Sequence, residues 1–271
     1  MAGTLPPTPA GGAGPRTTDE TLIGIFWGYD GAAELGTPPR LYNQIIRQIA
    51  IAQNNTEAQN AELFARVNAA MADAGILAWE NKYLYDYWRP VVGVREHDVS
   101  FGPEPEKAVN NISDEGDPFW LPLGAPASNA LGRSGSGPAK NVTPNFPAYP
   151  SGHATFGAAA LHATELFYAN LGKTSAQIVK GLGFVSEELN GVTRDNKGTI
   201  RPRHERKFKD LHQMIIENGL SRVYLGVHWF FDAFGTKPDD SPDPTQFVGG
   251  VPLGTRIADK TGAAPLKESP V

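Results

Sequence analysis

The sequence predicts an all-α fold, a helical bundle with long active-site loops, and three observations carry this prediction. Apolar residues recur at helical spacing in several separate segments of the 271-residue chain. Almost no segment alternates apolar and polar residues as a half-buried strand does. Glycine and proline are abundant, at 30 and 23 residues, but they cluster between the helical segments. Helices with one apolar stripe must bury it against one another, so a bundle follows.

The N-terminal part of the chain contains three expected helices. Residues 18–27 form a short apolar piece that ends at a glycine, and residues 40–53 show a clear helical period behind two prolines. Thr56 and Gln59 have the spacing of a capping box, which opens a third helix. We expect this helix to run to Trp88, because the Arg-Pro dipeptide that follows is a natural stop.

The rest of the chain has one long irregular stretch and further helices. Residues 91–150 are rich in Gly, Pro, Asn and Ser and show no sustained period, so we expect a long loop, which in a compact domain often carries function. Helical spacing returns over residues 153–171, 174–188 and 204–224. From Thr236 onward we expect a turn-rich tail.

These segments predict one catalytic domain with two appendages. Residues 1–18 are rich in Pro and Gly and read as a flexible N-terminal segment. Residues 19–235 would form the catalytic helical bundle, which is long enough to bury a sizeable core. Residues 236–271 would form the tail, packed on or beside the bundle.

Composition excludes several classes of function. The chain has 24 Lys+Arg against 29 Asp+Glu, a net charge of −5, which argues against binding to nucleic acid or to an anionic membrane but allows a local cationic cluster. It has no cysteine, so thiol, disulfide and zinc-thiolate chemistry are excluded. Since no run of 18 apolar residues and no signal-peptide pattern occur, we expect no membrane helix and, by default, a soluble cytoplasmic protein.

The first stretch with chemical potential contains Lys82 and Arg89. Seven residues apart on a helix, the two point to nearly the same side and lie about 10 Å apart along the axis, so their head groups can converge on one anion. A solvated cationic face is the usual alternative for such a pair. Five aromatic residues between Trp79 and Trp88 make the neighbourhood too apolar for an ordinary exposed face.

The second stretch is the sequence Pro150-Ser151-Gly152-His153 at the start of an expected helix. Backbone N–H groups at a helix N-terminus suit an oxyanion, and a glycine lets the backbone approach a ligand closely. Ser151 can donate a hydroxyl hydrogen bond, and His153 can act as an acid or a base near neutral pH. The alternative is a plain N-cap serine followed by a packed histidine, and this stretch alone leaves both interpretations open.

The third stretch runs from Arg222 to Asp232. His228 and Asp232 are four residues apart, so on a helix Asp232 can accept the N–H of one ring nitrogen and present the other nitrogen to a ligand. Arg222 would not share a face with His228 on one continuous helix, so either a break at Gly226 redirects the chain or the arginine reaches around. A core histidine satisfied by a carboxylate is the alternative interpretation.

Together the three stretches supply one lysine, two arginines, a serine hydroxyl, a helix-start amide and two histidines. This set can bind a tetrahedral oxyanion, because the cations neutralise its charge and the hydroxyl and amide orient it. The remaining histidines lie outside these stretches, and we assign them to the surface or to structure: His97, His162, His204 and His212.

The order Lys-x6-Arg-Pro, Pro-Ser-Gly-His and Ser-Arg-x5-His-x3-Asp resembles the motifs of the vanadium haloperoxidases and of the type-2 phosphatidic acid phosphatase superfamily. Every position of these motifs is present. The sequence from Asp19 onward is similar to the catalytic half of the fungal vanadium chloroperoxidases, and the similar stretches include residues 23–31, 37–44, 117–129, 186–192 and 249–254.

The resemblance implies a role for each motif residue. His228 would bind vanadium, with Asp232 behind it, and His153 would be the acid–base group. The family's vanadate-binding residues correspond to Lys82, Arg89, Ser151, Gly152 and Arg222. Lys82 would also act in catalysis, by polarising the bound oxidant. Asp30 looks like the family's partner of the first arginine, and Trp79 and Phe146 match aromatic residues of the halide pocket, where Phe146 favours chloride.

The activity that the resemblance implies is a vanadate-dependent haloperoxidase that oxidises chloride or bromide with hydrogen peroxide. The product would be hypohalous acid, which halogenates an organic acceptor, and phosphate could occupy the site when vanadate is absent. The alternative is an acid phosphatase that uses the same pocket with His228 as nucleophile. A non-catalytic oxyanion-binding protein ranks third.

The fungal enzymes have a second helical bundle ahead of the matched region. The helices that would pack on it must be covered in another way, so we expect either a homodimer or a sequence that is part of a longer protein.

Overall fold

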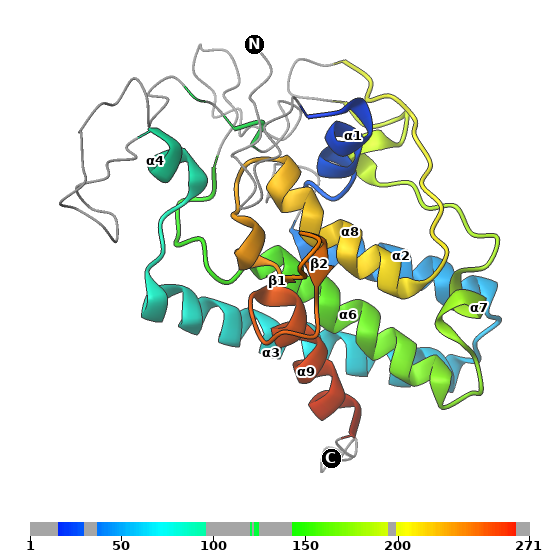
Figure 1. The fold of residues 1–271 in the computed structure, drawn as a ribbon. Coiled ribbons are helices and arrows are strands. Elements are labelled where there is room, and N and C mark those ends of the chain that lie inside the picture. Colours follow the sequence, from blue (N-terminus) through cyan, green and yellow to red (C-terminus); the bar gives the residue numbers. More distant parts are fainter. Residues whose placement is uncertain are drawn as a thin grey trace.

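The computed structural model describes residues 16–29, 37–95, 120, 122–124, 143–194 and 199–263. The all-α prediction is confirmed, since the described chain is mostly helical (Figure 1). The described helices are α1 (Thr18–Phe26), α2 (Pro38–Ala52), α3 (Glu57–Tyr85), α4 (Pro90–Arg95), α6 (Gly152–Ala169), α7 (Ser175–Val179), α8 (Leu211–Tyr224) and α9 (Gly250–Ala263), with 3-10 turns η3 (Glu187–Leu189) and η4 (Phe230–Asp232). Two short strands, β1 (Gly235–Thr236) and β2 (Pro242–Asp243), pair antiparallel. Within these residues no helix has the length and apolar character to cross a bilayer.

Helix α6 is the centre of the bundle. It packs against α2, α3, α7, α8 and α9, and in Figure 1 these helices surround it. Its sequence is apolar or small nearly all round, as expected for a core helix. Helix α9 crosses it at backbone contact: a Cβ on Gly250 would lie 2.4 Å from the Ser151 carbonyl oxygen, and one on Gly254 2.3 Å from that of Thr155. Glycine is therefore required at both positions.

The first helices begin where the sequence indicates. Thr56 caps α3 as expected: its hydroxyl accepts the N–H of Gln59 at 3.2 Å, and the Gln59 side chain accepts the N–H of Thr56 at 2.8 Å. The predicted end at Trp88 is three residues too late, because Asp86 adopts a left-handed conformation (φ 47°) that ends α3 at Tyr85.

Two of the later helix predictions are wrong in part. Over 174–188 only α7 is α-helical, because Gly181 has φ 76° and the chain then pairs as a bridge, Phe184 with Arg206, before η3 begins. The helix expected from His204 begins at Leu211 instead, because the preceding residues form these backbone bridges and Asp210 supplies the N-cap. Tertiary pairing thus overrides helical spacing in both segments.

The turn-rich tail is also corrected. Residues 236–249 do form turns around β1 and β2, but α9 follows them. Its glycines and proline are poor helix formers, and helix α9 forms because it packs closely on α6. Of the long loop expected over 91–150, the first part is the short helix α4, and most of the remainder lies outside the described residues, as does nearly all of the segment expected to be flexible. The domain boundaries stay a prediction.

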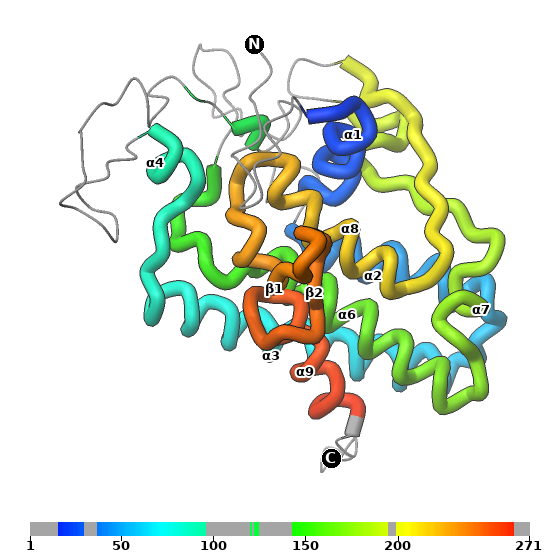
Figure 2. The backbone as a smooth tube through the Cα atoms, in the orientation of Figure 1, coloured from blue at the N-terminus to red at the C-terminus, as the bar shows by residue number. Residues whose placement is uncertain are grey.

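The loop before α6 connects the end of α3 with η4. The Ala148 N–H donates to the Tyr87 carbonyl at 2.7 Å, and the Ser151 N–H donates to the Asp232 carbonyl at 2.8 Å. In Figure 2 this green segment descends into α6 between the cyan end of α3 and the orange chain after α8. The three stretches singled out in the sequence therefore meet at one place.

Candidate active site

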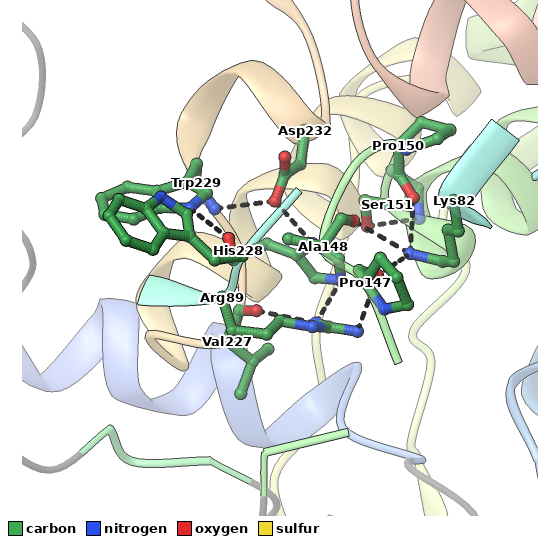
Figure 3. Close-up of polar contacts among 12 residues, drawn as sticks. Lys82, Arg89, Pro147, Ala148, Pro150, Ser151, Val227, His228, Trp229 and Asp232 are labelled. Carbon is green, nitrogen blue, oxygen red and sulfur yellow. Dashed lines mark hydrogen bonds and ion pairs between the residues drawn. The ribbon is translucent and has the colours of Figure 1, made fainter. Parts of the chain in front are cut away.

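Lys82 lies on the last turn of α3 with its side chain fully buried. Its ammonium donates to three backbone carbonyls, those of Pro147 at 2.9 Å, Ala148 at 2.9 Å and Pro150 at 2.7 Å (Figure 3). Burial, with the charges of Arg89 and Arg222 nearby, lowers the pKa of Lys82 to about 6. An anion beside Lys82 would raise this pKa again, because its negative charge offsets both the cost of burying the ammonium and the repulsion from the two arginines.

Arg89 spans the two sides of the site from the extended segment after α3. Its Nε donates to the Phe146 carbonyl at 2.9 Å, and its Nη1 donates to the Val227 carbonyl at 2.7 Å. The same Nη1 lies 3.0 Å from Nε2 of His228. Since a guanidinium nitrogen can only donate, Nε2 of His228 accepts and carries a lone pair.

His228 and Asp232 form the hydrogen bond expected from their spacing. The His228 Nδ1 lies 2.8 Å from Oδ2 of Asp232, and the same oxygen accepts the Trp229 N–H at 2.9 Å (Figure 3). Burial and the charges of Arg89, Lys82 and Arg222 hold the pKa of His228 well below 6.5, so the ring is neutral. Burial raises the pKa of the Asp232 carboxyl, while the Trp229 N–H and the nearby cations oppose this rise.

The pair is not on a helix, contrary to the simplest expectation. Helix α8 ends at Tyr224, and Gly226 (φ 70°) turns the chain, so His228 and Asp232 face each other across the approach to η4. The break at Gly226 was one of the two alternatives, and the structure shows it. Arg222 before the break is buried and lowers the pKa of Lys82 and of both motif histidines, so it faces the same site.

The Pro-Ser-Gly-His stretch forms the first turn of α6. Ser151 is its N-cap, and its hydroxyl accepts the Ala154 N–H at 3.3 Å. Gly152 leaves room for an aromatic ring, because a Cβ there would lie 2.7 Å from the Trp79 ring. His153 is 5 % exposed, and its Nε2 is buried without a partner among the described residues. The N-cap interpretation therefore holds for Ser151, but a merely packed, satisfied histidine does not describe His153.

His153 is neutral in this environment. Burial and the charge of Arg222 lower its pKa well below 6.5, and a hydrogen bond with the Trp27 backbone opposes this shift. Because Nε2 has no partner, that bond involves Nδ1, which therefore carries the proton. The Nε2 lone pair is thus available to take up a proton.

Trp79 and Phe146 form an aromatic wall beside the cations. Their ring centroids are 4.9 Å apart. The Lys82 Nζ lies 5.2 Å from the Phe146 ring centroid, and the Arg89 guanidinium lies 5.0 Å from it. Both distances are within the range of cation–π attraction. Asp30, the remaining predicted site residue, lies outside the described residues.

The donor set fits an oxyanion. Lys82, Arg89 and Arg222 are buried together, and within the described ranges Asp232 is the one carboxylate among them. Charge-assisted hydrogen bonds from lysine and arginine are strong in a buried setting, so this group of side chains suits an anionic ligand. The lone pair on the neutral His228 Nε2 suits a ligand bond to vanadium, provided that Arg89 Nη1 gives up this position.

Two residues that contact His153 were not recognised from the sequence. Tyr42 and Asn218 both hydrogen-bond to the His153 carbonyl, at 3.0 and 3.1 Å. In the sequence Tyr42 belongs to the apolar period of residues 40–53, which predicts only a core position. The signal that could have found them is Gly157, a glycine inside a helix, which often marks a close packing contact.

Fold and site together define a helical protein with a buried cluster of basic side chains and two neutral histidines, a set that suits an oxyanion. Residues 62–236 match the family described as the VCPO second helical-bundle domain, and the chain belongs to this family. It is 36 % identical to the vanadium chloroperoxidase of Curvularia inaequalis over 317 aligned positions, which cover 94 % of this chain and 48 % of that protein.

A solved structure shows the same fold. The crystal structure of a bacterial vanadium-dependent iodoperoxidase matches with a TM-score of 0.55 at 20 % identity, over 90 % of this chain and 43 % of that one. The chain therefore spans about half the length of the relatives that it matches.

Proposed function

We propose that this chain binds vanadate and uses hydrogen peroxide to oxidise chloride or bromide to hypohalous acid. The observation that carries the proposal is the neutral His228 Nε2 lone pair beside three buried basic side chains, those of Lys82, Arg89 and Arg222. Membership of the VCPO domain family supports it. The hypohalous acid would then halogenate an organic acceptor.

The residues of this pocket divide the work of holding the anion. His228 would provide the nitrogen ligand, and its bond to Asp232 keeps the proton on Nδ1 so that Nε2 stays available. Lys82, Arg89 and Arg222 would neutralise the oxygens, and the Ser151 hydroxyl with the Gly152 N–H would orient them. Bound vanadate would supply Lewis-acid activation of peroxide toward halide.

His153 is suited to moving a proton. Its Nε2 is unpartnered among the described atoms, and its lowered pKa keeps the ring in the base form at neutral pH. It would take a proton from hydrogen peroxide at Nε2 and return it to the product.

The aromatic wall is where we propose that the halide binds. Trp79 and Phe146 present an apolar surface, while Lys82 and Arg89 lie over the Phe146 ring and supply positive charge. A weakly hydrated anion benefits from both features. Phe146 at this position favours chloride oxidation in addition to bromide oxidation.

The decisive experiment uses protein purified without phosphate. We expect halogenation of a dione probe on addition of peroxide and chloride or bromide, and only when orthovanadate is present. His228→Ala should abolish the activity, and His204→Ala, outside the motifs, serves as the control. The acid phosphatase would become the preferred function if the protein showed no halogenation but hydrolysed p-nitrophenyl phosphate, with vanadate acting only as an inhibitor.

We also propose that the chain forms a homodimer. Several apolar side chains on α3 are exposed, among them Ile76, Tyr83 and Leu84, the last at 73 %. Burying such a surface is favourable, and a second copy would do so. Light scattering that gives only the monomer mass at micromolar concentration would exclude the dimer.

A further inference from the structure

The carbonyl oxygen of His153 is held by two side chains from other helices. Asn218 of α8 donates its Nδ2 N–H to this oxygen at 3.1 Å. The Tyr42 hydroxyl of α2 lies 3.0 Å from the same oxygen and 3.0 Å from Oδ1 of Asn218. Both side chains are fully buried. The single hydroxyl proton of Tyr42 thus lies between two acceptors, and the three groups form a closed triangle of hydrogen bonds.

This triangle requires a glycine in α6. A Cβ on Gly157 would lie 2.2 Å from Nδ2 of Asn218 and 3.1 Å from the Tyr42 hydroxyl oxygen. Glycine is unfavourable inside a helix, so its presence here indicates that the space is needed by the Asn218 amide. Gly157 lowers the local stability of α6, and the space that it leaves allows the Asn218 side chain of α8 to reach the His153 backbone.

Tyr42 also contacts the His153 side chain. The two rings meet edge to face, with centroids 6.0 Å apart and an interplanar angle of 67°. Rotation of the imidazole is therefore restricted on this side, while its Nε2 remains without a partner among the described residues. The same tyrosine thus holds both the backbone and the ring of His153.

We propose that Tyr42 and Asn218 are positioning residues for His153, which hold its backbone and ring so that Nε2 faces the oxyanion pocket. The catalytic consequence rests on the proposed function, whereas the position of the ring can be measured without it. Positioned acid–base groups lose efficiency steeply when they are displaced.

The test compares Tyr42→Phe and Asn218→Leu with the control Tyr168→Phe. Tyr168 lies on α6, the helix that carries His153, and its side chain is also fully buried. Its hydroxyl donates to Oδ1 of Asn55 at 3.0 Å, away from the site. All three changes remove one buried hydrogen-bonding group. The Tyr42→Phe variant loses a single oxygen atom, so it carries the test if Asn218→Leu fails to fold.

Three measurements separate positioning from plain stability. The ring nitrogens of His153 are followed by NMR on ¹⁵N-histidine protein, with His153→Gln to assign them, and inorganic phosphate is titrated to measure binding. Halide oxidation is measured with vanadate. In the two site variants we expect altered or exchange-broadened His153 signals and about a tenfold to hundredfold loss of kcat. Phosphate affinity should stay within about twofold, because the cations that bind the anion are unchanged.

The control variant decides the interpretation. Tyr168→Phe should leave the His153 signals and kcat as in the unmodified chain, even if it lowers the melting temperature as much as Tyr42→Phe does. Unchanged His153 signals in both site variants would overturn the proposal and leave the triangle a stabilising feature of the core. If the unmodified chain oxidises no halide but the His153 signals change as expected, the proposed function fails while the positioning role stands.

Discussion

Helix α6 carries two histidines whose surroundings are opposite. His153 on its first turn is buried beside the charge of Arg222, which lowers its pKa. His162, on the same helix, has a carboxylate at each ring nitrogen: Nδ1 lies 3.2 Å from Glu165 and Nε2 lies 2.9 Å from Asp259. Burial opposes the charged ring of His162, but its hydrogen bonds to these two carboxylates raise its pKa.

The difference shows that the charges around the two histidines are balanced in different ways. The charge of His162 is satisfied within the protein, because Asp259 comes from α9 and links the two helices. Around His153, on the first turn, the nearby charged side chains are basic and buried, and the described carboxylate, Asp232, already pairs with His228. Such a group of basic side chains suits an anionic ligand.

His228→Ala should have the largest effect, because it removes the nitrogen ligand that the pocket presents. We expect halide oxidation to fall by about a thousandfold or more, since both the ligand and its bond to Asp232 are lost. Calorimetric titration with orthovanadate should show the matching loss of affinity. Full vanadate affinity in this variant would mean that the three cations bind the anion without the histidine.

His153→Ala comes next and tests the comparison directly against His162→Ala. We expect halide oxidation to fall by about a hundredfold to ten-thousandfold in the first variant, because it loses its acid–base group. Vanadate should still bind, as the group removed is not a ligand. His162→Ala should keep its activity, and an equal loss in both variants would show that the effect arises from α6 as a whole.

Gly157→Ala should disturb the His153 end of the helix without touching His162. The added Cβ would lie 2.2 Å from Asn218 Nδ2, so we expect a loss of about 1–3 kcal/mol in the free energy of unfolding. Urea unfolding measures it. Gly75→Ala in α3 is the matched control, because its Cβ would meet only the end of the Phe156 side chain at 3.1 Å. Equal stability of the two variants would contradict the packing argument.

Local signals in the sequence predicted the parts of the fold that depend on them. The capping box at Thr56 and the apolar period of α2 mark helices that the structure contains. The same reasoning failed for α9, because Gly250 and Gly254 look like turn residues until α6 lies against them. Packing between distant segments decides such elements, and a single sequence does not display it.

The candidate site shows the same division. The spacing of His228 and Asp232 predicted their hydrogen bond, and the structure contains it, although on a turn and not on a helix. The positions of Tyr42 and Asn218 around His153 could not be predicted, since they depend on how α2 and α8 lie beside α6. Family motifs show which residues come together, and the residues that support them follow from tertiary packing.

The smallest predicted effect concerns His162 and its two carboxylates, where His162→Gln should destabilise the protein in a pH-dependent way. The folded-state pKa of His162 is raised above 6.5, so its contribution is complete below that pH and is lost as the pH rises through the folded value. We expect a gap of about 0.5–1 kcal/mol in the free energy of unfolding at about pH 5.5, and almost none at about pH 9.

The groups that face this histidine support that direction. Hydrogen bonds from His162 and Ser175 lower the pKa of Glu165, as does the nearby charge of His212, so Glu165 stays ionised in the acidic range used. Asp259 is largely exposed, and added salt should therefore narrow the gap. Urea unfolding at the two pH values, with His204→Gln as control, measures it. A gap that widens toward alkaline pH would show that α6 and α9 are held together by packing alone.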